Sequence, residues 1–162
     1  MYEPHRFIGN PPNQARIFES NMADELIIIN LDLDSISTET FSGLVSQVSS
    51  EIFMPLSVGG GIDTLEKASK FFEIGIEKIV VERGLINNGK EISKIANRYG
   101  NQSIIASCAY WGSISTPIPE SLKSRGVIAI EELPRRLREI QEIGIGEIMI
   151  NDASRDGTLE GL

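Results

Sequence analysis

In Ser57-Val58-Gly59-Gly60-Gly61-Ile62, an apolar strand pattern runs directly into three consecutive glycines, and a helix-start pattern follows at residues 63–66. Consecutive glycines permit a sharp turn and let bare backbone N–H groups approach a ligand closely. If the helix begins at that turn, its positive N-terminal end faces the same place, which favours a phosphate. A glycine run by itself is equally compatible with a plain tight turn. Its meaning therefore depends on the strand-then-helix units that recur along the chain.

The composition is that of one ordinary globular domain. We treat residues 1–162 as a single domain. The net charge of −8 argues against a nucleic-acid partner, because phosphate backbones attract clustered Lys and Arg. Cys108 is the only cysteine, which excludes an intrachain disulfide and offers no zinc-binding pattern. The chain shows no signal-peptide pattern and no apolar run long enough to span a bilayer. We expect a cytoplasmic protein with no membrane partner, no metal and no cofactor.

Five short apolar runs predict the strands of a sheet. Most are rich in β-branched residues and are nearly continuous rather than alternating. Continuous apolar strands are typical of a parallel sheet, which is covered on both faces. The five runs are residues 26–29, 55–58, 78–81, 103–106 and 148–150.

Helical periodicity fills the intervals between these runs. Gly75, Gly100 and Gly144 stand where three of the helices should end. Asp63 together with Glu66 matches a capping box at the helix that follows the glycines. The apolar stripes, which we interpret as core-facing, begin at Phe41, Leu65, Ile92 and Leu133.

A short phrase recurs three times along the chain: a helix exit, an acidic residue, then a strand. Its copies begin at Met22, Gly75 and Gly144. Repetition of a β/α unit predicts a (β/α) barrel or a doubly wound sheet. Residues 109–127 break this rhythm, and their Pro, Ser and Gly content predicts an irregular loop that includes a possible hairpin.

Five motifs in a fixed order resemble one enzyme family across essentially the whole chain. They lie at residues 6–11, 24–26, 54–62, 100–103, and 146–148 with 154–158. The chain resembles the cyclase subunit of imidazole glycerol phosphate synthase, an enzyme of histidine biosynthesis. More narrowly, it resembles the paralogues that work with a glutamine amidotransferase to add acetamidino groups to cell-surface sugars.

The resemblance implies an α/β fold, the eight-stranded TIM barrel of about 250 residues. The chain matches strands two to six of that pattern, which implies a partial TIM (β/α)8 barrel with a parallel sheet. Five parallel strands cannot close such a barrel, so we expect unpaired edges at residues 26–29 and 148–150. We therefore hypothesise that the chain is part of a longer protein or pairs with another chain.

The family's activity needs ammonia from a glutaminase partner and a phosphorylated small-molecule substrate, a ribulosyl bis-phosphate. Two aspartates, on the first and fifth strands, act as general acid and base. In this chain the first strand is missing, and Ala109 stands at the position of the second aspartate. A methyl group cannot transfer a proton, so no family catalytic residue is carried over. Glu82 and Arg83 replace an Asn-Thr pair of the family, and Asn30 replaces a buried aspartate.

The resemblance also implies binding residues. For the substrate phosphates they are Gly60 and Gly61, and the loop of Asp156 and Gly157. The residues that the resemblance assigns to the ring around the ammonia entrance and to the partner interface are Glu25, Glu77, Lys78 and Glu147. From the residues alone, solvated strand starts explain these charges better, and the resemblance reverses that preference.

Other chemistry stays open at this point. Asp32 and Asp34, or Asp152 with Asp156, would suit Mg²⁺ or acid–base work, although plain loop acids explain the first pair better. Cys108 is a candidate nucleophile, but the only histidine, His5, lies far away in the N-terminal segment, which favours a small core residue. The aromatic residues that open the irregular loop would stack on a ring-shaped ligand or anchor the loop; they are Tyr110 and Trp111.

Two classes of function follow. The first is an ammonia-accepting, cyclase-type subunit of a glutamine amidotransferase pair, impaired as it stands, with surface-sugar acetamidino modification as its variant. The second is a non-catalytic remnant or scaffold that keeps a phosphate pocket or the glutaminase-binding surface.

Overall fold

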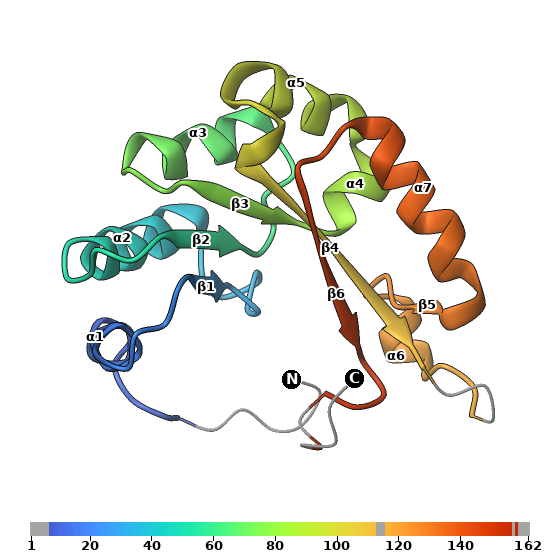
Figure 1. The fold of residues 1–162 in the computed structure, drawn as a ribbon, viewed down its shortest axis with the longest axis horizontal. Coiled ribbons are helices and arrows are strands. Elements are labelled where there is room, and N and C mark those ends of the chain that lie inside the picture. Colours follow the sequence, from blue (N-terminus) through green and yellow to red (C-terminus); the bar gives the residue numbers. More distant parts are fainter. Residues whose placement is uncertain (1–6, 113–115, 157, 159–162) are drawn as a thin grey trace.

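The structure is a computed structural model that describes residues 7–112, 116–156 and 158. Strands and helices alternate along the chain (Figure 1). The strands are β1 (Leu26–Ile29), β2 (Leu56–Gly59), β3 (Lys78–Val81), β4 (Ile104–Trp111), β5 (Ile128–Ala129) and β6 (Glu147–Asp152). The helices are α1 (Pro11–Ser20), α2 (Thr38–Ser49), α3 (Leu65–Glu73), α4 (Arg83–Asn87), α5 (Gly89–Tyr99), α6 (Glu120–Lys123) and α7 (Leu133–Ile143).

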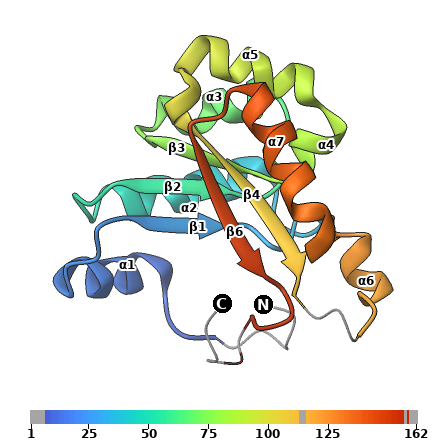
Figure 2. The ribbon, with the colours of Figure 1, turned by 45° about the vertical axis from the view of Figure 1, so that its right-hand side comes forward.

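The strands form one parallel sheet that curves into an arc. Its order is β1-β2-β3-β4, and β6 pairs with β4 along residues 105–110. On one side of β4, strand β3 pairs with residues up to Ala106. Further along the same side, the short β5 pairs with Tyr110 and Trp111. Helices α2, α3, α5 and α7 lie on the convex side of the arc in both views (Figures 1 and 2). This is the parallel half-barrel that the resemblance implied.

The core fills the space between the convex face of the sheet and its helices. Val58, Ile79 and Ile104 are neighbours in adjacent strands and are fully buried. They pack in one cluster with apolar side chains of the helices, such as Val45 and Ile95. Because side chains alternate along a strand, the next row points to the concave side. That row contains Ser57 and Lys78, so the concave face is polar at the amino ends of the strands.

The irregular segment at residues 109–127 was predicted only in part. β4 continues through Ala109 to Trp111, three residues into that segment. The part that follows contains α6 and leads to β5, which is parallel to β4, so a hairpin does not form between them. The first helix, α1, was not predicted at all, although Pro11 directly after Asn10 is a helix-start signal.

The helix after the glycines begins one residue later than the capping box predicted. The Thr64 hydroxyl accepts a hydrogen bond from the Lys67 N–H at 3.3 Å, and this makes Thr64 the N-cap of α3. The Asp63 carboxylate instead binds the Lys67 ammonium at 2.8 Å. The predicted helix ends at Gly75, Gly100 and Gly144 are confirmed. Gly100 and Gly144 directly follow α5 and α7, Gly75 lies two positions after the last residue of α3, and all three have positive φ.

Both ends of the arc are open in the part of the chain that the structure describes. There β1 pairs with β2 alone, and β6 pairs with β4 alone. Ile148 and Ile150 of β6 are 40% and 41% exposed, although their neighbours in β4, Ala106 and Cys108, belong to the core. The predicted unpaired edges are therefore present. Within the same described ranges, the structure has no helix with the length and apolar character needed to cross a membrane.

Candidate functional site

All strands of the sheet point the same way, so their amino ends meet at one edge and their carboxyl ends at the other. Three charged residues come together at the amino edge. The Lys78 ammonium lies 2.7 Å from a carboxylate oxygen of Glu147 and 3.6 Å from one of Glu25. The Ser57 hydroxyl donates to the other oxygen of Glu25 at 2.5 Å. We call Glu25, Lys78 and Glu147 the amino-edge cluster.

The electrostatics of this cluster keep Lys78 charged. The hydrogen bond to Glu147 raises the pKa of Lys78, and the nearby charge of Glu25 raises it further, while partial burial opposes both. Lys78 and Glu147 are separated by 69 positions in the sequence, and the strand register alone brings them together. The sequence thus identified three residues that the fold places in contact. Their part in guarding an ammonia entrance stays a prediction.

Glu77 directly precedes Lys78 and connects the beginnings of two strands. Its carboxylate accepts a hydrogen bond from the Leu56 N–H at 2.8 Å, which fixes the beginning of β2 against the beginning of β3. Glu77 is also exposed at the amino edge. Its predicted place at a partner interface is compatible with that exposure and stays untested.

The triple glycine borders a hollow of about 330 Å³ at the opposite, carboxyl edge. A Cβ atom on Gly60 would lie 2.3 Å from the Asn30 carbonyl oxygen, and Gly61 has φ +69°, so a side chain is excluded at the first position and strained at the second. The tight-turn interpretation of the glycines is therefore correct. The turn also places the backbone of Gly60 and Gly61 along a hollow, and phosphate binding at these glycines requires such an open space. The hollow is lined by residues 30, 33, 36–39, 41, 60–62, 67 and 71.

One ammonium group and the beginning of a twelve-residue helix face this hollow. The Lys67 ammonium donates to the Gly61 carbonyl oxygen at 3.0 Å. Ser37 caps α2 by accepting from the Thr40 N–H. Glu39 also lines the hollow, but its carboxylate is paired with Lys70 at 2.5 Å. The positive end of α2 suits a small anion, and the Lys67 ammonium, which is also paired with Asp63 at 2.8 Å, lies beside it.

Asp152 organises the loop after β6. It is 5% exposed and accepts hydrogen bonds from the Gly112 N–H and from both the N–H and the hydroxyl of Ser154. Burial raises the pKa of Asp152, but these hydrogen bonds and the charge of Arg155 outweigh it, so the pKa lies below its ordinary value. Asp152 thus joins the ends of β4 and β6, a role that the sequence did not indicate.

The two predicted phosphate segments share the carboxyl edge but not one cavity. Asp156 follows the end of β6, and of the predicted phosphate residues that the structure describes, only Gly60 and Gly61 line the hollow. Gly157 lies outside the described residues. The same is true of His5, and of Arg6 in the first family motif.

Ala109, which the resemblance puts at the position of a catalytic aspartate, is buried. Beside it is a cavity of about 10 Å³, roughly one water molecule in size, which Glu82, Cys108 and Arg136 also line. Burial raises the pKa of the Glu82 carboxyl, and the charge of Arg83 opposes that rise only in part. Burial likewise raises the pKa of the Cys108 thiol, which disfavours the nucleophilic thiolate.

The remaining candidates have structural explanations. Asp32 and Asp34 are exposed, and the Asp32 carboxylate accepts from the Ser35 N–H within its own loop. The Trp111 indole N–H donates to the Thr116 carbonyl oxygen at 3.0 Å, as a loop anchor would. Across residues 7–112, 116–156 and 158, His, Cys, Asp and Glu form no group of three that would hold a metal ion.

Comparison with known proteins agrees with this architecture. The family model described as "Histidine biosynthesis protein" matches residues 2–162. The chain belongs to this family. The HisF subunit of imidazole glycerol phosphate synthase from Chlorobium phaeovibrioides is 34% identical to it over 160 residues. Two provisionally named subunits of the same enzyme, HisF of Leptospira interrogans and hisF2 of Pseudomonas aeruginosa, are 36% and 32% identical.

Each of these alignments covers 99% of this chain and 63–64% of the relative. The chain therefore spans slightly less than two thirds of the length of the family members that it matches. This agrees with a sheet that forms an arc rather than a closed barrel.

Proposed function

We propose that this chain supplies the ammonia-accepting, cyclase-type part of a glutamine amidotransferase pair of the imidazole glycerol phosphate synthase kind. The observation that carries the proposal is the amino-edge cluster. The structure holds Lys78 between the carboxylates of Glu25 and Glu147 at the beginning of the strands, and this cluster would line a polar passage into the concave side of the sheet. Ammonia released by a glutaminase subunit would enter there, in the cytoplasm.

The substrate is proposed to bind at the opposite edge. Gly60 and Gly61, with Lys67 beside them, suit one phosphate group of a bis-phosphorylated sugar. The Asp156 and Gly157 loop would take the second phosphate. With ammonia arriving at one edge and the substrate held at the other, the concave face would connect the two sites.

A second candidate function rests on Ala109. Because its methyl group cannot exchange a proton, the chain would bind a phosphorylated ligand and a glutaminase without catalysing cyclisation. The surface-sugar variant of the first proposal would keep ammonia transfer but use a different acceptor. Both alternatives share the binding surfaces of the first proposal and differ in turnover.

The test compares two nitrogen sources for the natural protein that carries this chain, mixed with the glutaminase subunit from its own source organism. The variant is Lys78→Met, and the control is Lys94→Met, which removes an exposed lysine of α5. We expect Lys78→Met to lower glutamine-dependent turnover of the ribulosyl bis-phosphate by about tenfold or more while ammonium-dependent turnover persists.

The outcomes separate the candidates. Equal loss with both nitrogen sources would contradict a passage at Lys78. Binding of phosphate and glutaminase without any turnover would replace the first proposal with the second. Absence of both binding and turnover would overturn both.

A further inference from the structure

Two large apolar side chains stand in solvent at the amino edge, beside the amino-edge cluster. Met22 is 87% exposed and Phe53 is 100% exposed. Met22 precedes β1 and Phe53 precedes β2, and these strands pair in parallel register from Leu26 and Leu56 onward. Both side chains therefore lie at the edge where Lys78 begins β3. We call Met22 and Phe53 the amino-edge apolar pair.

Met22 has a left-handed backbone conformation that is strained for a residue with a side chain, although glycine at this position would allow the same helix ending. Its N–H donates to the Glu19 carbonyl and the next N–H to the Phe18 carbonyl, which is a Schellman ending of α1. The same two bonds end α3 at Gly75, with φ +90°. Met22 holds this left-handed conformation at φ +59°, and glycine would adopt it without strain. The repeated phrase thus has glycine in two copies and an exposed methionine in the third.

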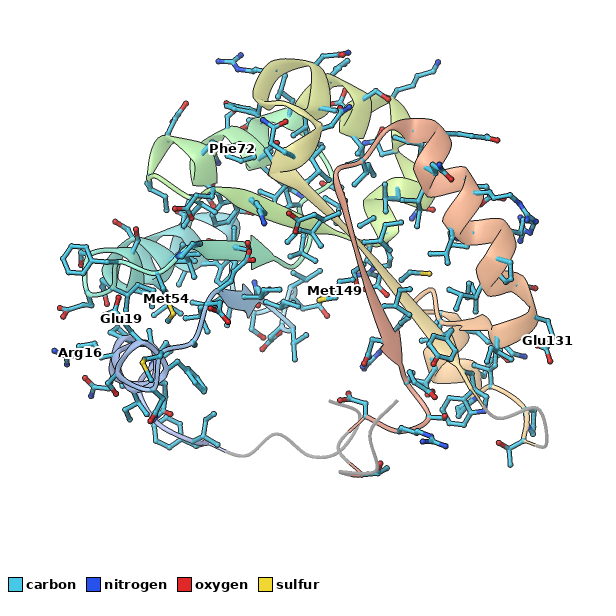
Figure 3. All side chains as sticks on the ribbon, in the orientation of Figure 1. Arg16, Glu19, Met54, Phe72, Glu131 and Met149 are labelled. Carbon is cyan, nitrogen blue, oxygen red and sulfur yellow. The ribbon has the colours of Figure 1, made fainter. Side chains whose placement is uncertain are left out.

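The backbone at Phe53 is held in place from α1. A carboxylate oxygen of Glu19 accepts hydrogen bonds from the N–H groups of Phe53 and Met54, at 2.5 Å and 3.1 Å. Figure 3 shows Glu19 on α1 next to Met54. Because this loop is fixed to α1, whose Schellman ending contains Met22, the two apolar side chains are presented on a common rigid support. Rigid presentation lowers the entropy lost on binding.

We propose that the amino-edge apolar pair anchors the glutaminase subunit, which makes Met22 and Phe53 the residues that hold the ammonia-producing partner over the amino-edge cluster. The inference rests on the proposed function, whose passage opens at the same edge. Methionine and aromatic residues are enriched at the centres of protein interfaces. Strain at an exposed position is retained where a function selects the side chain.

The charges around the pair describe the partner's surface. Asp24, Glu51 and Glu77 are exposed and precede β1, β2 and β3, so they lie at the same edge. The complementary surface is an apolar recess with a basic rim. A second copy of this acidic chain, or an anionic membrane, would be repelled by the same carboxylates.

The test uses variants whose effects on stability and on binding differ. Met22→Gly removes the strain, so it should raise the Tm of the natural protein that carries this chain, yet weaken its Kd for the purified glutaminase about tenfold. Phe53→Ser should leave Tm unchanged and weaken the Kd by about ten- to a hundredfold. The matched control is Leu31→Ser, which removes a 52% exposed apolar side chain at the carboxyl edge and should change neither quantity.

Calorimetric titration and thermal unfolding decide the matter. Unchanged glutaminase affinity in both Met22→Gly and Phe53→Ser, with wild-type binding intact, would overturn this inference and leave the proposed partner standing. Absence of binding by the wild type would remove the partner itself. Loss of self-association in Phe53→Ser without loss of glutaminase affinity would assign the pair to a second copy and also overturn the inference.

Discussion

Glu82 is a partly buried carboxyl group that lines the same small cavity as Ala109. Burial raises its pKa above 4.5, its ordinary value, so the folded state prefers the neutral acid. Well below pH 4.5 the carboxyl is neutral in both the folded and the unfolded state, so it does not lower the free energy of unfolding. As the pH rises above 4.5, the unfolded chain ionises more readily, and stability is lost.

We therefore expect Glu82→Gln to raise the Tm at pH 7 by roughly 1 to 3 °C and to leave it unchanged near pH 4. Thermal unfolding at the two pH values measures this difference. Glu131→Gln, at an exposed position, is the control. A Glu82→Gln variant that is less stable at pH 7 would indicate an ionised carboxylate with a stabilising partner.

Asp152 provides the opposite case. Despite its burial, hydrogen bonds from Ser154 and Gly112 lower its pKa below the ordinary value of 3.8. Its contribution to stability is present above pH 3.8 and disappears as the pH falls below that value. Asp152→Asn should lower the free energy of unfolding by about 1 to 3 kcal/mol at pH 7.

Urea unfolding at pH 7 and pH 3 tests the Asp152 argument. The deficit of Asp152→Asn should shrink at pH 3, because the carboxyl of the unfolded wild type takes up a proton below pH 3.8 and the advantage of the folded carboxylate decreases. A deficit of equal size at both pH values would instead assign the effect to packing. Asp32→Asn, which changes an exposed loop carboxylate, serves as the comparison.

The residue-scale contacts also show what the sequence can and cannot predict. Lys78 and its two carboxylates were identified because they match a family pattern. Glu19 and Asp152 match no such pattern, and their hydrogen bonds to Phe53 and Gly112 span 34 and 40 positions. Contacts of that length depend on how the elements pack, so a local sequence signal does not reveal them.

At the scale of elements, the strands and the four longer helices around β2 to β6 were predictable because burial imposes a period on them. The two-residue β5 and the four-residue α6 are too short for any period. Strand β5 forms where β4 extends beyond β3, because Tyr110 and Trp111 have no β3 partner on that side. Helix α1 was missed because its apolar stripe is weak and Ala15 is its one buried residue. Its start was indicated only by the two prolines at its first positions.

The N-terminus of α3 gives a prediction about a single element. Thr64→Ala removes the side chain that caps the helix and should cost about 1 kcal/mol of stability. Asp63→Ala removes only a partly exposed pair with Lys67 and should cost at most about 0.5 kcal/mol. Chemical denaturation of both variants decides between Thr64 and Asp63 as the cap, and a larger loss in Asp63→Ala would restore the capping box predicted from the sequence.

In the part of the chain that the structure describes, the molecule is an arc of parallel strands whose two edge strands, β1 and β6, are each paired on one side only. A closed barrel has no edges, and an open sheet normally blunts them with charges, prolines or covering elements. At the β6 end, Ile148 and Ile150 continue an apolar row whose members in β4 are buried, so apolar side chains of this row are partly exposed at the edge. The β1 end has a similar character, since Ile27 is also partly exposed.

The two edges predict how the 162-residue chain behaves when it is expressed by itself. We expect it to self-associate as its concentration approaches about 1 mM, because unpaired backbone and apolar side chains at β6 can pair with another copy. The double variant Ile148→Lys and Ile150→Lys should shift light-scattering masses toward the monomer, since two charges cannot be buried in such a contact. Ile17→Lys, which adds a charge on α1 and none in β6, should leave association through β6 unchanged. A wild-type chain that stays monomeric at that concentration would mean that its edges are already protected.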